Sequence, residues 1–216
     1  MNPIVALSGN EEKDIVASLR ANSKGHVVAH YELYKQVSHL QGCIVNCGVE
    51  GEEHYESFAL LRNLLGNGQS QKVVSFEKYS RNMYFDNTFL PFGALFYKME
   101  SVPFNMPMVK LRLQQQGIIN HDDSVKGHGW ESIPQYLIEN PELKISFLVI
   151  DADDYETSMT ALQFLYPRLM HGGMLVLDSL QESEEDYAAV CDYFEERIAD
   201  MDVHIEGKGV YYMVKK

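Results

Sequence analysis

The chain has 216 residues, of which 45% are hydrophobic, and its formal net charge is -13. This length and hydrophobic content can bury a full core, and they favour a single domain over residues 1–216. Acidic residues outnumber basic ones by 31 to 18, and no Lys/Arg cluster stands out, so nucleic acid is an unfavourable partner. Nowhere do 18 apolar residues run together, so we expect no membrane contact and a soluble, cytoplasmic protein.

The first part of the chain predicts a strand that is followed by a glycine. Residues 1–25 are polar and are expected to form an N-terminal extension, and a helix is predicted over residues 27–40. The first central strand is expected at Cys43–Cys47, directly before Gly48. A glycine in this place lets the backbone approach a ligand, and the next helix offers its N-terminus. The alternative interpretation is a tight strand-to-helix turn, which every α/β unit needs.

Two further strands end next to candidate ligand-binding side chains. The strand predicted over residues 72–76 is followed by Glu77, which can accept hydrogen bonds from both ribose hydroxyls of an adenosine. The strand predicted over residues 124–127 is followed by His128 and Trp130, and either ring can line an adenine pocket. The alternatives are a surface glutamate that begins a loop and a structural histidine.

The connection over residues 81–123 is long and rich in aromatic residues, methionine and proline. Long segments on such a scaffold often form lids or substrate walls, and Met and aromatic side chains make adaptable apolar surfaces. We therefore expect this insertion to shape the substrate site. The alternative is that its apolar residues pack into the core or into the interface of a homodimer.

A strand, a helix and a second strand are predicted over residues 143–180. The apolar run Ile145–Ile150 is typical of a parallel strand that is buried on both faces, and it stops at Asp151. Apolar residues then recur at helical spacing, and the glycines at 172 and 173 are expected to end that helix. The next strand, predicted over residues 174–177, is followed by Asp178. A parallel crossover of this kind places Asp151 and Asp178 side by side, where open α/β sheets bind ligands.

The C-terminal part predicts a helix and a closing hairpin. Ser183 begins a capping-box pattern, and strands are predicted over residues 203–206 and 210–214 around two glycines. The whole pattern predicts an α/β, Rossmann-like sheet of about seven strands. Most of the strands should be parallel, the C-terminal hairpin antiparallel, and helices should cover both faces.

Two stretches carry a resemblance to a known family. They read YELYKQVSHLQGCIVNCGVEG and IDADDYETSMTALQFLYPRLMHGGMLVLDS. The second resembles the macrocin O-methyltransferase (TylF/MycF-like) family, whose members carry a similar D-x-D-x-Y-E-x-T segment, a helix ending in Y-P-R-L, a Gly-Gly turn and a strand ending in Asp-Asp. The first is similar to that family's helix and cofactor strand. The resemblance implies that the predicted sheet is a Rossmann-like class I methyltransferase sheet. It also implies an S-adenosylmethionine-dependent O-methyltransferase that acts on a hydroxyl of a small molecule such as a sugar or a glycosylated metabolite.

The same resemblance assigns roles to individual residues. The residues expected to bind S-adenosylmethionine are Asn46, Gly48, Val49, Glu50, Gly51, Glu77, His128 and Asp151. Asp151, Asp178 and Ser179 are expected to hold Mg²⁺, which prefers oxygen ligands. Asp151 and Asp153 are the expected catalytic residues, because the acceptor hydroxyl must lose a proton to a base or through a bound cation.

Three positions depart from the family pattern and keep alternatives open. Asn46 stands where the family has Glu, Glu52 where it has Gly, and Ser179 where it has Asp. These departures motivate a second hypothesis, a catalytically weak or silent protein of the same fold with a binding or regulatory role. A third hypothesis, an NAD-dependent oxidoreductase, is disfavoured by the missing third glycine and by the terminal hairpin.

Overall fold

The computed structural model describes residues 26–48, 72–78, 122–195, 202–204 and 210–216, together with positions 58, 59, 61, 62 and 65. The expected N-terminal extension and almost all of the 81–123 insertion lie outside these residues. Every structural statement below concerns the described part of the chain.

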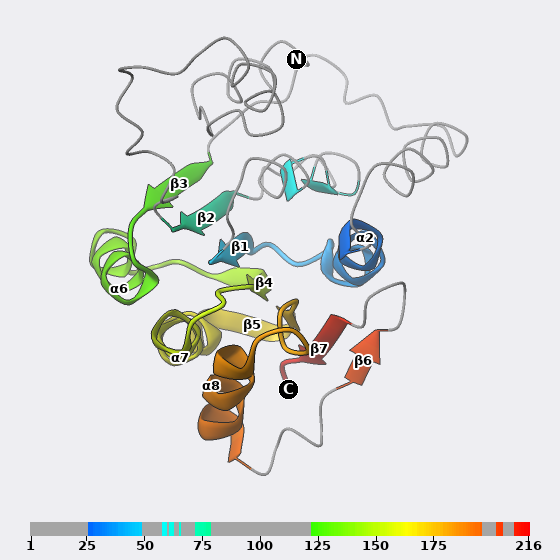
Figure 1. Ribbon diagram of the computed structural model, residues 1–216. Helices are drawn as coiled ribbons and strands as arrows, with labels where there is room; N and C mark the ends of the chain where they lie inside the picture. The colour runs from blue at the N-terminus through cyan, green and yellow to red at the C-terminus, as the bar shows by residue number, and fades with distance from the viewer. Residues whose placement is uncertain are drawn as a thin grey trace, which may run out of the picture.

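The described strands form one sheet of seven, in the order β3-β2-β1-β4-β5-β7-β6 (Figure 1). The strands are β1 (Cys43–Cys47), β2 (Val73–Glu77), β3 (Asp123–Lys126), β4 (Ile145–Ile150), β5 (Leu169–Leu177), β6 (Asp202–His204) and β7 (Val210–Val214). Strands β1 to β5 pair in parallel, whereas β7 pairs antiparallel with both β5 and β6. The expected methyltransferase sheet with a C-terminal hairpin is confirmed.

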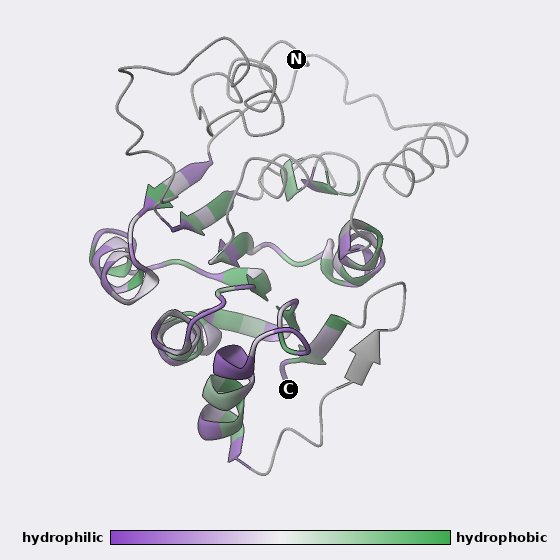
Figure 2. Ribbon diagram, in the orientation of Figure 1, coloured by the Kyte–Doolittle hydropathy of each residue, from purple (hydrophilic) through white to green (hydrophobic). Residues whose placement is uncertain are grey.

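Helices cover both faces of this sheet. The described helices are α2 (His26–Val37), α6 (Gly129–Glu139), α7 (Tyr155–Phe164), α8 (Glu184–Phe194) and the short 3-10 helix η2 (Tyr166–Arg168). Helices α6, α7 and α8 lie on one face and α2 lies on the other (Figure 1). Figure 2 shows the central strands coloured mainly as hydrophobic and the helices mixed, as expected for amphipathic helices on a buried sheet.

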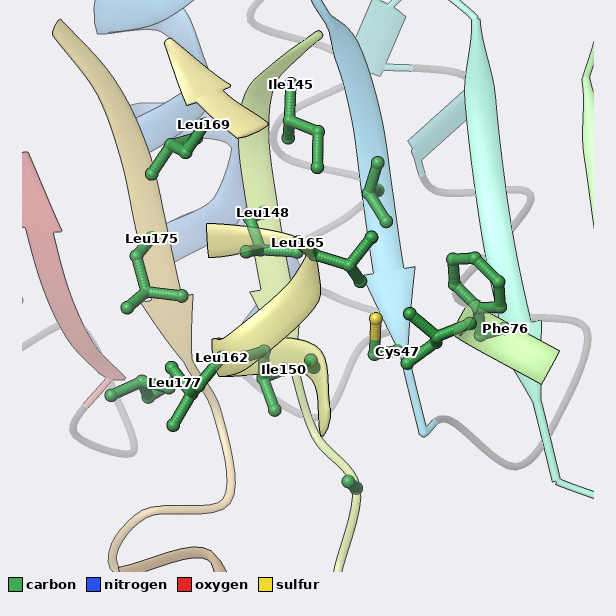
Figure 3. Packing of buried hydrophobic residues seen from close by; sticks show 14 of the residues in the cluster. Cys47, Phe76, Ile145, Leu148, Ile150, Leu162, Leu165, Leu169, Leu175 and Leu177 are labelled. Atoms are coloured by element: carbon green, nitrogen blue, oxygen red, sulfur yellow. The ribbon is translucent and has the colours of Figure 1, made fainter. Parts of the chain in front are cut away.

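The core is divided by the sheet into two layers, because side chains alternate along each strand. In β1, Val45 and Cys47 pack on the side of α6, α7 and α8, whereas Ile44 packs on the side of α2. All six residues of β4 are buried, which confirms the strand predicted to be buried on both faces. Figure 3 shows Leu148 and Ile150 of this strand packed with Leu162 and Leu165 beneath α7.

The two glycines at 172 and 173 do not end a helix, so this prediction is wrong. Helix α7 ends at Phe164, and β5 already begins at Leu169 and runs through both glycines. The register between β4 and β5 shifts in this region, and Gly172, with φ +78°, donates its N–H to the carbonyl of Lys215 at 2.8 Å. The glycines therefore form an irregularity inside a strand, where a positive φ lets the backbone bend without breaking its pairing with the C-terminal residues.

None of the helices in the described ranges is long and apolar enough to cross a membrane.

Gly48 and Gly172 form a matched pair for testing how tightly the sheet edge is packed. Both have a positive φ, but a Cβ on Gly48 would lie 2.2 Å from the Cα of Ala152, whereas a Cβ on Gly172 would meet nothing within 4 Å. We expect Gly172→Ala to cost about 1–2 kcal/mol of unfolding free energy from backbone strain alone. Gly48→Ala should cost more than about 3 kcal/mol because the backbone after β4 must also move. Urea unfolding of both variants measures the difference, and equal losses would contradict the close packing.

Candidate functional site

The carboxyl ends of five neighbouring strands meet in a row at one edge of the sheet. Hydrogen bonds continue the pairing one step past the strands: Gly127 N to Glu77 O (3.0 Å), Gly48 N to Phe76 O (2.9 Å), Asp151 N to Cys47 O (2.9 Å) and Asp178 N to Ile150 O (3.1 Å). The predicted neighbourhood of Asp151 and Asp178 is thus present. The row also brings Gly48 and Glu77 to the same edge.

Gly48 lies where β1 meets the turn after β4. Its φ is +96°, and a Cβ would come within 2.5 Å of the Asp151 carbonyl oxygen. Only a glycine fits here, because the backbones of two neighbouring strand ends touch. The other expected residues of this loop, Val49, Glu50 and Gly51, lie outside the described residues.

Glu77 and His128 lie at the ends of the two strands beyond β1. The Glu77 side chain is buried, and one of its carboxylate oxygens accepts a hydrogen bond from Ser124 Oγ at 3.0 Å. His128 is exposed and stacks on Trp130, with 4.3 Å between ring centroids and 12° between planes. A carboxylate beside an exposed pair of stacked rings is an arrangement that can hold the ribose and the base of a nucleoside.

Asn46 lies inside β1 rather than at its end. It is 2% exposed, and its Oδ1 has no hydrogen-bond partner among the described residues. Strand alternation puts it on the same face as Ile44, toward α2. It is therefore two residues short of the row of strand ends.

Asp178 is held by histidines of α2, which the sequence interpretation missed. His30 Nε2 lies 2.7 Å from Asp178 Oδ2, and both side chains are buried. His26 Nδ1 lies 3.7 Å from the same oxygen. Burial alone raises the pKa of the Asp178 carboxyl, but His30 and His26 outweigh burial and hold this pKa below its usual range. Asp178 in turn raises the pKa of His26. The spacing of His26 and His30 could have indicated that both point the same way, because residues four apart lie on one face of a helix.

Asp151 and Asp153 follow β4 and differ in their surroundings. Burial raises the pKa of Asp151 to about 6, and the charges of Asp178 and Asp153 add to the shift. Asp153 is exposed and has a positive φ of 53°. Asp151 is therefore a carboxyl group that exchanges its proton near neutral pH.

Asp186 ties this turn and the end of β5 to helix α8. Its buried carboxylate accepts hydrogen bonds from Ser158 Oγ and Ser179 Oγ and from the backbone N–H of Asp153 at 3.2 Å. Ser183 caps α8 as predicted, accepting from Asp186 N at 3.1 Å. The capping-box pattern that begins at Ser183 includes Asp186 and predicts a role only at the start of this helix. The Asp186 side chain instead points toward the ends of β4 and β5.

The expected magnesium ligands can be tested against these contacts. The described residues contain no group of three or more His, Cys, Asp or Glu side chains arranged around one point. However, Asp178 Oδ1 is buried and has no hydrogen-bond partner among them, while Asp151 loses solvation next to it. A cation would satisfy both, since ligating carboxylates usually have their second oxygen hydrogen-bonded, here to His30. Ser179 donates its proton to Asp186 and keeps its lone pairs.

Residues 108–214, just under half of the chain, match the family model described as macrocin-O-methyltransferase (TylF). This segment is similar to the TylF family. The match confirms the resemblance found in the sequence and the expected class of enzyme, an S-adenosylmethionine-dependent O-methyltransferase. The segment includes Asp151 and Asp178, whereas Gly48 and Glu77 precede it.

Several solved methyltransferase structures share the fold of this chain. Apo CalS11, a TDP-rhamnose 3'-O-methyltransferase of calicheamicin biosynthesis, is 20% identical, with 97% of this chain and 96% of that chain covered and a TM-score of 0.64. The O-methyltransferase NovP is 15% identical, with 88% and 79% covered and a TM-score of 0.61. MycE, in complex with Mg, SAH and mycinamycin VI, is 11% identical, with 99% and 55% covered and a TM-score of 0.50. No curated protein sequence matches the chain significantly.

The raised pKa of Asp151 gives a pH dependence of stability. A carboxyl group whose pKa rises from 3.8 to about 6 on folding destabilises the folded state when it ionises. We therefore expect the free energy of unfolding to fall as pH rises from about 4 to about 6, by roughly 1–3 kcal/mol. Asp151→Asn should remove this fall and be more stable than the wild type at neutral pH. Urea unfolding across this pH range tests it, with the exposed Glu156→Gln as the control. If the free energy of unfolding still falls over this pH range in Asp151→Asn, the fall does not come from Asp151.

Proposed function

We propose that this protein transfers the methyl group of S-adenosylmethionine to a hydroxyl of a sugar or of a glycosylated metabolite. The observation that carries the proposal is the row of strand ends, which brings a close-approach glycine, an acidic residue and two further carboxylates to one edge. The TylF match and the fold shared with CalS11 and NovP support the same class of acceptor.

In this proposal the cofactor lies along the ends of β1 and β2. Glu77 accepts hydrogen bonds from the ribose hydroxyls, and the stacked rings of His128 and Trp130 lie against the adenine. The methionine part passes over Gly48, where the absence of a Cβ leaves room for the backbone to approach. The sulfonium then lies close to Asp151, whose negative charge is favourable for a cationic ligand.

The chemical step is a displacement at the methyl carbon. The acceptor oxygen attacks this carbon in line with the leaving sulfur, a bond to oxygen forms, the bond to sulfur breaks, and S-adenosylhomocysteine leaves. Most of the rate gain comes from holding the two groups in line. The hydroxyl proton passes to a carboxylate at the edge. Without a bound cation, a pKa of about 6 suits Asp151 to accept it near neutral pH, and Asp153 accepts it when Asp151 ligates a cation.

We further propose that Asp151, Asp178 and Ser179 hold Mg²⁺ beside the acceptor. The unpartnered Oδ1 of Asp178 and the burial of Asp151 support the first two ligands. When bound, the ion would make the acceptor hydroxyl more acidic. The residues of the chain would orient it, with His30 fixing the Asp178 carboxylate.

Calorimetric titration of S-adenosylmethionine into the purified protein tests the cofactor site. We expect binding in the micromolar range, and Glu77→Gln should weaken it about tenfold because a ribose hydrogen bond to a charged acceptor is lost. Glu139→Gln, which changes an exposed glutamate at the far end of α6, is the matched control.

Methyl transfer from labelled cofactor to nucleotide-linked and free sugars tests the acceptor. Cofactor binding without transfer to any hydroxyl acceptor would favour the catalytically silent alternative. Absence of cofactor binding would contradict the proposed function itself.

The magnesium proposal predicts a specific loss in Asp178→Asn. Because this variant removes a charged ligand and its pair with His30, we expect Mg²⁺ binding to weaken at least about tenfold and any Mg²⁺ response of the activity to disappear. Asp192→Asn, which removes an exposed carboxylate bonded only to Tyr155 among the contacts seen, controls for lost charge. An unchanged Mg²⁺ response in Asp178→Asn would show that the ion binds elsewhere or is not used.

A further inference from the structure

A lysine crosses the row of strand ends. Lys78 directly follows Glu77 at the end of β2, and its ammonium lies 2.8 Å from Asp154 Oδ2. The same ammonium donates a hydrogen bond to the carbonyl oxygen of Ala152. Both partners belong to the turn after β4. The side chain therefore connects two strands that do not pair with each other.

The strand order places this crossing at the edge of the sheet where open α/β sheets bind ligands. Because β1 lies between β2 and β4, a side chain from the end of β2 to the turn after β4 must pass the end of β1, which is followed by Gly48. Strands β2 and β3 lie on one side of β1, and β4 and β5 lie on its other side. The strand order therefore reverses between β1 and β4. Ligands of open α/β sheets bind in the crevice at that point.

The surroundings of the Lys78 ammonium are strongly acidic. Asp151, Asp153 and Asp178 are close enough to one another to raise the pKa of Asp151, and Asp154 is in direct contact with the lysine. S-adenosylmethionine brings a sulfonium, an ammonium and a carboxylate. The two cationic groups are favourable in such a place, but the carboxylate is not unless a cation accompanies it. Among the described residues, Lys78 is a cation that reaches this crevice.

Releasing Lys78 from Asp154 leaves the protein around it intact. Asp154 uses its other oxygen, Oδ1, to cap α7 by accepting from Thr157 N at 2.7 Å. Lys78 and Asp154 are also partly exposed, at 24% and 19%, and an ion pair with that much solvent access is weak. One carboxylate can therefore replace another at the ammonium without loss of the cap.

We propose that Lys78 binds the carboxylate of the cofactor's methionine part, exchanging Asp154 for it. This inference rests on the proposed use of S-adenosylmethionine and assigns one group of that cofactor to one side chain. Lys78 becomes a cofactor-binding residue, and Asp154 holds its ammonium in the crevice when no cofactor is present.

Two adenosine ligands separate the carboxylate contact from the rest of the binding site. S-adenosylhomocysteine carries the amino-acid part, whereas 5'-methylthioadenosine has the same adenosine and thioether without it. We expect Lys78→Met to weaken S-adenosylhomocysteine about tenfold, as the loss of a charge-assisted pair does, and to leave methylthioadenosine unchanged. Calorimetric titration of the full chain measures both affinities. Loss of a positive charge by itself would strengthen binding of the ligand's ammonium, so a weakening is diagnostic of the carboxylate.

Two further variants complete the test. Lys78→Arg should retain most of the affinity for S-adenosylhomocysteine. Asp154→Asn should bind it more tightly than the wild type, because asparagine still caps α7 but no longer competes for the ammonium. Equal effects on both ligands, no effect, or tighter binding of S-adenosylhomocysteine in Lys78→Met would overturn the inference while leaving the proposed function standing. If the wild type binds neither ligand, both the inference and the proposed function fail.

Discussion

The contact between Gly48 and Ala152 is the constraint on which the candidate site depends. It is a backbone contact between the end of β1 and the turn after β4, at the point where the strand order reverses. Because these two segments touch there, the ends of the flanking strands stay aligned. The hydrogen bonds that extend the ladder to Asp151 and Asp178 can then form. A side chain at position 48 would separate the β1–β2 half of the edge from its acidic half.

The acidic half is held by partners that come from opposite faces of the sheet. From the α2 face, His30 holds the buried carboxylate of Asp178. From the other face, Asp186 of α8 accepts hydrogen bonds from Ser179 and from the turn at Asp153. The Asp178 carboxylate and the turn at Asp153 are thus each positioned by a neighbour from a helix, which is the arrangement that a site relying on orientation requires. Lys78 adds a positive group in contact with the turn after β4.

A structural feature could be predicted from the sequence when it depends on residues that are close together in the chain. The buried strands, the helix cap at Ser183 and the C-terminal hairpin depend on local patterns, and all were predicted from them. The glycines at 172 and 173 were misjudged because a positive φ serves a helix end and a strand irregularity equally well. Only the pairing with Lys215 distinguishes them.

The sequence by itself determined the sheet and the neighbourhood of Asp151 and Asp178, because buried apolar runs and the rules of parallel crossovers fix those. The resemblance to the TylF family came from its local motifs. The tertiary structure alone decided which groups surround these carboxylates. His30 lies 148 positions from Asp178 and Lys78 lies 74 from Ala152. No periodicity within either segment encodes such distant contacts. They arise when helices pack on the two faces of the sheet and when strands distant in sequence become neighbours, so the charges that set the chemistry of the site appear only in the folded chain.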